Sequence, residues 1–530
     1  MRYTWWLTRP KRSLAPVPLV LAAMTKGAGG MNWGAGRRET GLAVEAMLET
    51  AGLKRTGDRR DQGAGGARTY RAWLKSLGLI FMRDDTMHLT WAGQGLVEGE
   101  APLPILTKQV LNYQFPSAFT AKGASAVSGN FKVRPFIFLL QLLRDPRLEG
   151  RLVEKDEVAK LAVCYGTSNS PSVVDDVVER ILSYRRTGVE SLDPDFLDKF
   201  RSTRSNEATL EQLFGNLGDI ANTAGNWLGY TQLISRIDGE WEIVSGAEEE
   251  VDHLIEQALA TPLIKDWDNE EKFQRRYGLK PGQAKDTRSL TDAQSVTATS
   301  LEQRSIEIAF QALAATRLID AISQDVVNEI SEGTGAPVAR VDWVLAQKYP
   351  SGAVDGFMNS YAQMAFESRE KATEFEKATT SIFRDVFGFE ARHIGAYSER
   401  PDVVISSHEA GYGAILDSKA YKKGYSLGVS QRNRMRDYIA NFEEYALDSN
   451  PLAFFAYVVS EYKSNVESQL RDVAEENGVN GAAITARDII RMVRRHRDRP
   501  YSHEEIRAIF SGNRPVVLSD LQDLSEGAFR

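Results

Sequence analysis

The stretch from Arg400 to Ala420, RPDVVISSHEAGYGAILDSKA, constrains the fold more than any other part of the chain. It contains two apolar, strand-like runs separated by a turn rich in Ser, His and Gly. Asp402 comes just before the first run, and Asp417-Ser418-Lys419 ends the second. Because side chains alternate along a strand, Asp417 and Lys419 should point to one face, to which Ser418 contributes only its carbonyl. The pattern therefore predicts a hairpin that brings two carboxylates and an amine together.

This combination of groups is typical of a magnesium-dependent nuclease. Mg²⁺ binds through one or two carboxylates together with water and substrate phosphate, so Asp402 and Asp417 are its predicted ligands. The ion can activate water and neutralise the charge that builds up on a phosphodiester, while Lys419 orients the water or steadies the pentavalent phosphorus. Two Asp and a Lys also occur at strand ends by chance, so the short motif alone leaves a purely structural interpretation open.

The sequence around this motif resembles the cleavage domain of FokI-like restriction endonucleases, which have the PD-(D/E)xK fold. The resemblance covers FEKATTSIFRDVFGFEARHIG, RPD and GAILDSKAYKKGYSLGVSQRNRMRDYI. It continues through VVSEYKSNVESQLRDVAEENGVNGAAITARDIIRMV as a closing strand, a helix, an Asn-Gly turn and a final helix. The resemblance implies an α/β nuclease domain with a mixed sheet flanked by helices. It also implies metal ligands at Asp402 and Asp417 and a catalytic lysine at Lys419.

Two residues upstream of the motif also match positions of the family. Glu376 matches a helical acid and is a predicted catalytic residue, because it could hold an outer-shell water of the metal. Alternatively, it is a solvated acid on a helix whose apolar side includes Phe375 and Ile382. A lone histidine before a strand is more often a hydrogen-bonded turn residue, and Mg²⁺ favours oxygen, so His393 is left out of the predicted metal site.

The helix after the catalytic lysine pairs two cleavage domains in this family through an oppositely charged couple. The matching positions here are Asn433 and Asp437, so the couple is not kept. Arg432 and Arg436 could supply other ion pairs across such an interface, or they could form a solvated face. One active site of this kind cuts one strand, so a double-strand break needs two. Self-association as a dimer or a higher homo-oligomer such as a tetramer is therefore expected.

Length and composition agree with an intracellular enzyme of several domains. A chain of 530 residues is expected to hold about three or four domains. The single cysteine, Cys164, excludes internal disulfides and is compatible with a reducing compartment. The apolar run from Leu14 to Met24 is interrupted by Pro16 and Pro18 and is too short to span a bilayer. No membrane association is expected, and the predicted location is the bacterial cytoplasm.

The distribution of charge predicts double-stranded DNA as the partner of the N-terminal part. The net charge of the chain is −7, but residues 1–75 hold fourteen Lys and Arg against five Asp and Glu. Phosphate binding depends on local charge, because each neutralised phosphate releases counterions. The predicted DNA-binding residues in the first part of this basic region are Arg37, Arg38, Arg59 and Arg60.

A helix followed by a hairpin, as in winged-helix modules, is predicted twice in the first half. ARTYRAWLKSLGLI predicts an amphipathic helix ended by Gly78, and FMRDDTMHLTWAGQGLVEG predicts a hairpin and a short helix. Recognition helices of such modules enter the major groove, although an ordinary solvated helix face fits the same pattern. The predicted contacts on this helix are Arg68, Arg71 and Lys75.

The second unit begins with the apolar run VRPFIFLLQLL and includes a polar turn, TSNSP, that opens another helix. NWLGYTQLISRIDGEWEIV predicts its wing, with Asp238-Gly239 as the turn. ILTKQVLNYQFPSAF, VRPFIFLLQLL and CYGTSNS resemble the recognition regions of AlwI-type and related type IIS nicking endonucleases, which implies a sequence-reading half. The predicted DNA-binding residues here are Arg180, Arg185 and Arg186.

The expected architecture is a multidomain chain with mainly α, winged-helix-like recognition modules and a C-terminal α/β PD-(D/E)xK nuclease domain. The predicted boundaries are 1–110 and 111–275 for the two recognition subdomains, 276–349 for a linker and helical connector, and 350–530 for the nuclease. The linker is the polar stretch from Gly278 to Ser300. Such a hinge would let the nuclease reach beyond the sequence that the first half holds.

The expected function is that of a type IIS restriction endonuclease. Such an enzyme would recognise an asymmetric double-stranded sequence and cut at a fixed distance outside it with Mg²⁺, leaving 5′-phosphate and 3′-hydroxyl ends, and a companion methyltransferase is expected in the host. One alternative is a strand-specific nicking endonuclease, which the altered Asn433 and Asp437 positions keep open. The other is a catalytically silent DNA-binding protein, against which the intact Asp402, Asp417 and Lys419 argue.

Overall fold

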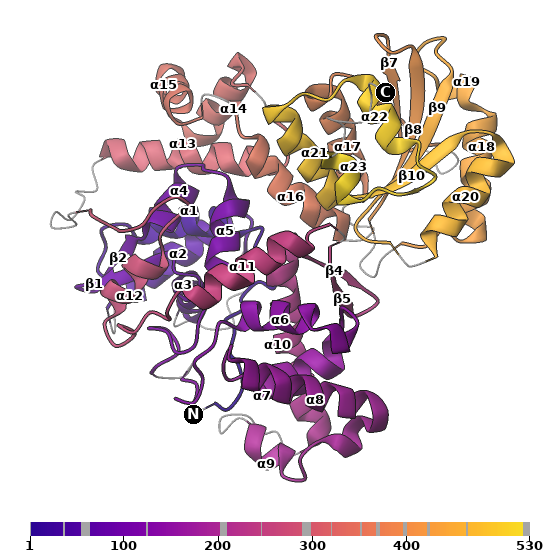
Figure 1. Ribbon diagram of the computed structural model, residues 1–530. Coiled ribbons are helices and arrows are strands. Elements are labelled where there is room, and N and C mark those ends of the chain that lie inside the picture. The colour runs from indigo at the N-terminus through magenta and orange to yellow at the C-terminus, as the bar shows by residue number, and fades with distance from the viewer. Residues whose placement is uncertain are drawn as a thin grey trace.

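Figure 1 shows the computed structural model of the chain, in which a helical N-terminal half and a sheet-containing C-terminal region lie side by side. The structure describes residues 2–522 except for 35–37, 55–63, 123–125, 202–208, 245, 289–297, 320, 350–351, 367–371, 396–399, 421–424 and 463–464. In this part of the chain, no helix is both long and apolar enough to cross a membrane.

The first unit contains three helices followed by a hairpin. The elements are α1 (Val17–Ala28), α2 (Arg38–Thr50), α3 (Gly65–Ser76), β1 (Ile80–Arg83), β2 (Thr86–Leu89), α4 (Trp91–Val97) and α5 (Pro102–Leu111). The apolar face of α3 buries Trp73 and Leu74, and Gly78 follows its end with a φ of 70°. Asp84 and Asp85 form the hairpin turn with positive φ values. The predicted order of helix and hairpin is present.

The second unit is mainly helical and carries a small sheet with the strand order β3-β5-β4. Its elements are α6 (Pro135–Arg144), β3 (Arg151–Val153), the π-helix η3 (Glu154–Ala162), α7 (Val163–Tyr165), α8 (Pro171–Thr187), α9 (Phe196–Phe200), α10 (Leu210–Tyr230), β4 (Ile234–Ile237), β5 (Glu240–Ile243), α11 (Glu248–Ala260) and α12 (Glu270–Tyr277). Asp238 and Gly239 turn the β4–β5 hairpin as predicted. One continuous hydrophobic core extends from Trp5 to Val251, so the two units pack as one body.

The first part of the predicted linker is attached to the N-terminal half. The backbone N–H of Ala92 donates to the carbonyl of Gly278 at 2.8 Å, and Lys108 donates to the carbonyl of Lys280 at 2.9 Å. Residues 289–297 lie outside the described part. After them, a helical connector has its own hydrophobic cluster, and its first helix contacts α1. The connector comprises α13 (Ala298–Ala314), α14 (Gln324–Thr334) and α15 (Val338–Lys348).

The C-terminal region is built on a six-stranded sheet with the order β11-β10-β9-β8-β7-β6. Strands β6 to β8 are antiparallel, and β8 to β11 are parallel, which confirms the predicted mixed sheet. The strands are β6 (Glu390–His393), β7 (Val403–Ser407), β8 (Tyr412–Lys419), β9 (Leu452–Val459), β10 (Asn480–Thr485) and β11 (Arg514–Pro515).

Helices cover both faces of this sheet, as Figure 1 shows. One face packs on α16 (Val354–Phe366), α17 (Ala372–Ser381) with the π-helical turn η6 (Ile382–Val386), α21 (Ala486–Asp498), α22 (His503–Phe510) and α23 (Leu518–Gln522). The other face packs on α18 (Val429–Ala440), α19 (Phe442–Tyr445) and α20 (Val466–Asn477).

Strand β10 was not anticipated from the sequence, which predicted that the final helix directly follows the Asn-Gly turn. Gly478 does form that turn, with a φ of 65°, but the chain then pairs with β9 before α21 begins. The small residues Ala482 and Ala483 fill opposite faces of the sheet. Their small side chains do not give the β-branched or aromatic signal by which strands are normally recognised.

The two halves of the molecule meet at the β4–β5 hairpin. Arg487 of α21 donates to the carbonyl of Ile234 at 2.8 Å and to Oε1 of Glu461 at 3.3 Å. The same Glu461 oxygen accepts from the backbone N–H of Arg236 at 3.2 Å. The hairpin that was predicted as a wing is therefore hydrogen-bonded to the C-terminal region.

Candidate active site

Strands β7 and β8 bring the predicted catalytic groups together. Their register pairs Val403 with Leu416, so Asp402 and Asp417 are neighbours at the end of the hairpin. Nζ of Lys419 lies 2.8 Å from Oδ1 of Asp417 and 3.3 Å from Oδ2 of Asp402. The alternation that was predicted for Asp417 and Lys419 thus places both beside Asp402.

The two carboxylates are buried, and the environment shifts the pKa values of Asp402 and Lys419. Only 8% of Asp402 and 3% of Asp417 is exposed. Burial, and then the charge of Asp417, raise the pKa of Asp402 well above its usual range. Burial opposes the charge on Lys419, but Asp417 and Asp402 outweigh it and raise the pKa of the ammonium. With both carboxylates ionised, one ammonium leaves the trio with an excess negative charge, which suits a divalent cation.

The backbone supports this arrangement in a way that alternation did not predict. The N–H of Ser418 donates to Oδ2 of Asp402 at 2.8 Å, so Ser418 contributes more than a carbonyl. The β7–β8 register ends at Val403, which leaves this amide free to bind the carboxylate. The Ser418 hydroxyl lies 3.4 Å from Oγ1 of Thr379 on the other face of the sheet.

Helix α17 places the third predicted carboxylate, Glu376, near the trio. Its side chain is buried, and its Oε2 lies 2.8 Å from Nε2 of His393 at the end of β6. The charge of Glu376 is one of the factors that act on Asp402, after burial and the closer charges of Asp417 and Lys419. The structure therefore brings Glu376 close to the trio, together with the histidine that sequence reasoning set aside.

The predicted interface residues lie on α18, and two of them form ion pairs within the chain. Arg432 forms an ion pair with Asp472 of α20 at 3.0 Å. Arg436 pairs with Glu476 of α20 and donates to Oδ1 of Asn433 at 3.2 Å. Asn433 and Asp437 are exposed. Their part in self-association stays a prediction.

Most of the predicted DNA-binding residues that the structure describes are engaged within the chain. Arg71 donates to the carbonyl of Trp33 at 3.0 Å and stacks on its ring, and Lys75 pairs with Glu270. Arg180 pairs with Asp176 and Asp193, and Arg185 pairs with the buried Glu157. The exposed residues of the set are Arg38, Arg68, Arg185 and Arg186, whereas Arg37, Arg59 and Arg60 lie outside the described residues.

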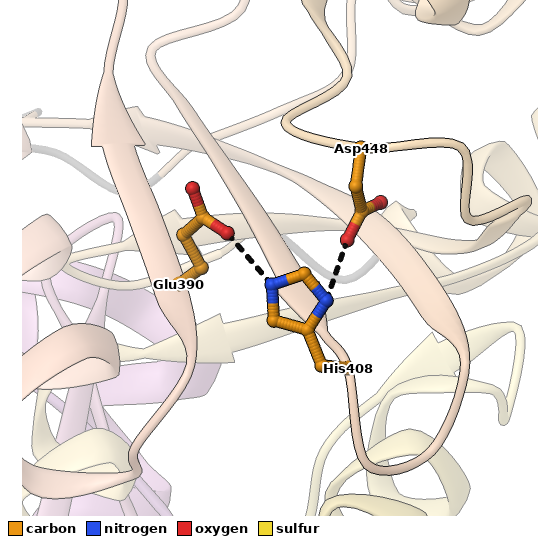
Figure 2. A group of neighbouring side chains, drawn as sticks. All are labelled: Glu390, His408 and Asp448. Atoms are coloured by element: carbon orange, nitrogen blue, oxygen red, sulfur yellow. Dashed lines mark hydrogen bonds and ion pairs between the residues drawn. The ribbon is translucent and has the colours of Figure 1, made fainter.

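A second group of charged residues lies at the other end of the β7–β8 hairpin and was not singled out from the sequence. Figure 2 shows His408, in the hairpin turn, between two carboxylates. Its Nε2 lies 2.9 Å from Oε2 of Glu390, and its Nδ1 lies 3.3 Å from Oδ2 of Asp448. Such a group has the donor types of a metal site. However, each ring nitrogen faces a different carboxylate, so two ion pairs already account for the arrangement.

Comparisons with known proteins were made for both sequence and fold. Residues 336–517 match the family model described as FokI, cleavage domain. The type II restriction enzyme StsI of Streptococcus sanguinis is 28% identical over 151 residues, which are 26% of this chain and 25% of that protein. The type II restriction enzyme FokI of Planomicrobium okeanokoites is 26% identical over 129 residues, 22% of each chain. The chain thus matches at most a quarter of the length of these relatives.

The comparison of folds matches solved structures only at low TM-score and low identity, as two of them show. The structure of restriction endonuclease FokI covers 97% of this chain and all of its own, with a TM-score of 0.29 and 15% identity. The BpuJ1 endonuclease binding domain, in complex with pyrene- and phenanthrene-modified DNA, covers 52% of this chain and 96% of its own, with a TM-score of 0.36 and 13% identity. Residues 336–517 are thus similar to the FokI cleavage domain, and the trio of Asp402, Asp417 and Lys419 lies within the matched segment.

Proposed function

We propose that this protein is a type IIS restriction endonuclease that recognises an asymmetric DNA sequence with its N-terminal half and cuts outside it. The observation that carries the proposal is the buried trio of Asp402, Asp417 and Lys419 within a segment similar to the FokI cleavage domain. The basic residues 1–75 and the two helix-and-hairpin units support a DNA-reading role for the first half.

The donor set of the trio fits Mg²⁺, because it offers carboxylate oxygens and an excess negative charge in a buried site. Asp402 and Asp417 would hold the ion. When bound, Mg²⁺ supplies Lewis-acid stabilisation of the charge that develops on the phosphate. Lys419, held by both carboxylates, would donate to a phosphate oxygen or hold the attacking water. Attack of water on phosphorus breaks the bond to O3′, which leaves a 5′-phosphate and a 3′-hydroxyl.

A double-strand break by this mechanism requires two active sites, and so self-association through the nuclease domain. The exposed Asn433 and Asp437 of α18 would take part in that contact. A specific observation favours nicking as a second candidate function. Arg432 and Arg436 are already paired with acids of α20 in the same chain, so fewer charges are available to a second copy.

The contacts between the two halves suggest how cutting is restrained. Arg487 and Glu461 of the cleavage domain bind the backbone of the β4–β5 hairpin. The recognition half would thereby hold the nuclease until its target is bound. Cutting near each copy of the recognition sequence would also threaten the genome of the host, so a companion methyltransferase is expected. Rapid non-specific cutting by the intact protein would argue against this restraint.

The decisive experiment is digestion of a plasmid of known sequence with MgCl₂, followed by sequencing of every end. Double-strand ends at one fixed distance from a shared asymmetric sequence are expected. Nicks at such a distance would instead support the second candidate function. Ends scattered without any shared sequence, or the absence of cleavage at every protein concentration, would contradict the proposal.

A further inference from the structure

Next to the trio, a partly buried histidine and a buried glutamate form a pair that the mechanism above does not use. Nε2 of His393 lies 2.8 Å from Oε2 of Glu376, and only 19% and 11% of the two side chains are exposed. Glu376 comes from α17, and His393 from the end of β6. The pair therefore links a helix that covers the sheet to the edge strand next to β7.

The glycine two residues after His393 shows how closely this pair approaches Asp402. A Cβ on Gly395 would lie 2.8 Å from Oε2 of Glu376, 3.1 Å from Nε2 of His393 and 3.4 Å from Cα of Asp402. The N–H groups of Ile394 and Gly395 both donate to the carbonyl of Asp402, at 2.9 and 3.3 Å. A side chain at residue 395 would therefore displace the Glu376 carboxylate from its present position.

The position of Glu376 brings a third carboxylate to a site that already has two. A buried carboxylate is costly unless it is hydrogen-bonded, and an apolar residue at this position of α17 would avoid the cost. His393 is the side chain that binds the Glu376 carboxylate. Hydrogen bonds among the residues around a metal site typically orient its ligands and tune its affinity for the metal.

We propose that His393 is a positioning residue, which holds the Glu376 carboxylate toward Asp402 so that Glu376 can bind a water of the metal's outer shell. This inference rests on the proposed function, because it assigns the pair to the same divalent-cation site. The N–H at Nε2 of His393 donates to Oε2 of Glu376, and the other carboxylate oxygen remains for water. Without this bond, the Glu376 carboxylate rotates away from Asp402.

The test compares His393→Ala with His393→Gln, since the glutamine amide can donate from a similar position. His393→Ala and Glu376→Gln are each expected to lower the cleavage rate about 10- to 100-fold and to raise the Mg²⁺ concentration for half-maximal rate. His393→Gln should recover most of the rate. A wild-type rate in His393→Ala, or a His393→Gln variant no better than His393→Ala, would overturn the proposal.

The chain provides a matched control in His408, which lies 2.9 Å from a glutamate in the same domain but at the far end of the hairpin. His408→Ala removes a histidine–glutamate contact of similar length from the exposed end of the hairpin, so it reports the effect of losing such a contact in this domain away from the trio. It should leave the rate and the Mg²⁺ dependence unchanged. An equal loss of activity in His408→Ala and His393→Ala would show that His393 acts only through stability.

A direct metal titration separates failure of this inference from failure of the proposed function. Mn²⁺ binding to the intact protein without DNA is measured by calorimetry for wild type, His393→Ala and His393→Gln. His393→Ala should weaken Mn²⁺ binding several-fold, and His393→Gln should restore it, whether or not the protein cuts DNA at a fixed distance. Equal Mn²⁺ affinity in all three proteins would reject the role of His393 even if cleavage is of the type IIS kind.

Discussion

The two ends of the β7–β8 hairpin carry similar sets of charged groups in opposite environments. At one end, 11% of the Asp402 side chain, 4% of Asp417 and 17% of Lys419 are exposed. At the other end, the values are 50% for Glu390, 69% for His408 and 20% for Asp448.

This difference in exposure separates charges whose burial costs free energy from exposed charges that cost little. Ion pairs in water contribute about 0–1 kcal/mol each, so the exposed group can form without a functional reason. Burying two carboxylates with only one ammonium is unfavourable by several kcal/mol. Stability alone does not account for the buried carboxylates of the trio, which favours a chemical role for them. The predictions below test this distinction, beginning with the largest expected effect.

Asp417→Asn should abolish cleavage, with a loss of at least about a thousand-fold, because it removes a metal ligand and a partner of Lys419. The metal-free variant should be as stable as the wild type or more stable, since one of two neighbouring buried negative charges is gone. Cleavage is measured on plasmid DNA and stability by urea unfolding. A variant that cuts at the wild-type rate would show that the trio is structural.

The two ends should also respond to pH in opposite directions. At the buried end, the pKa of Asp402 is raised, so the native state binds a proton that the unfolded state has already released. The free energy of unfolding of the metal-free protein should therefore fall as the pH rises through the pKa of Asp402. Asp402→Asn should remove this slope, and added Mg²⁺ should reduce it. Urea midpoints measured across the pH range provide the check.

At the exposed end, burial opposes the shift, but hydrogen bonds from Ser406 and Asn450 outweigh it and lower the pKa of Asp448. Its contribution to stability should be present near neutral pH and should be lost as the pH falls through its pKa. In a plot of the free energy of unfolding against pH, Asp448→Asn should reduce the loss of stability at acid pH. The fall at higher pH, which is assigned to Asp402, should stay unchanged. If Asp402→Asn and Asp448→Asn changed the stability in the same pH range, the distinction between the buried and the exposed end of the hairpin would be contradicted.

Distance along the sequence explains which charged groups of this domain the sequence could predict to meet. Asp402, Asp417 and Lys419 lie within one hairpin, so strand alternation and a short spacing are enough to bring them together. Glu390, His408 and Asp448 come from three separate segments, and no local pattern predicts that they meet. The same holds for the contact between Glu376 and His393, which depends on how α17 packs on the edge of the sheet.

The N-terminal half shows the same limit for charged residues. Helical periodicity placed Arg71 and Lys75 on the less apolar side of α3, but it could not show that α12 brings Glu270 to Lys75. Similarly, Glu157 comes from η3 to meet Arg185 of α8. Acidic residues that are distant in the sequence pair with some of these arginines and so determine which of them remain available to DNA. Local periodicity therefore predicts the helices better than the partners of their charges.

Arg185 and Arg186 allow this point to be tested with adjacent residues. Arg185 pairs with Glu157, of whose side chain only 3% is exposed, whereas Arg186 has no ion-pair partner among the described residues. Arg185→Ala should destabilise the protein by about 1–2 kcal/mol, because a buried carboxylate loses its partner. Arg186→Ala should leave unfolding unchanged and, if Arg186 binds a phosphate, reduce the salt dependence of DNA binding by about one ion. The reverse pattern would contradict the assignment.

The smallest effect is expected for His408→Ala at the exposed end of the hairpin. The change removes two ion pairs in water, so the free energy of unfolding should fall by no more than about 1 kcal/mol. Cleavage should stay within about twofold of the wild type, because the group lies at the opposite end of β7 and β8 from the trio. If His408→Ala instead impaired cleavage, and chelation of a tightly bound metal from the wild type had the same effect, the exposed end would also be functional. The exposed fraction of the side chains would then no longer show whether a cluster of charged residues in this domain is structural or functional.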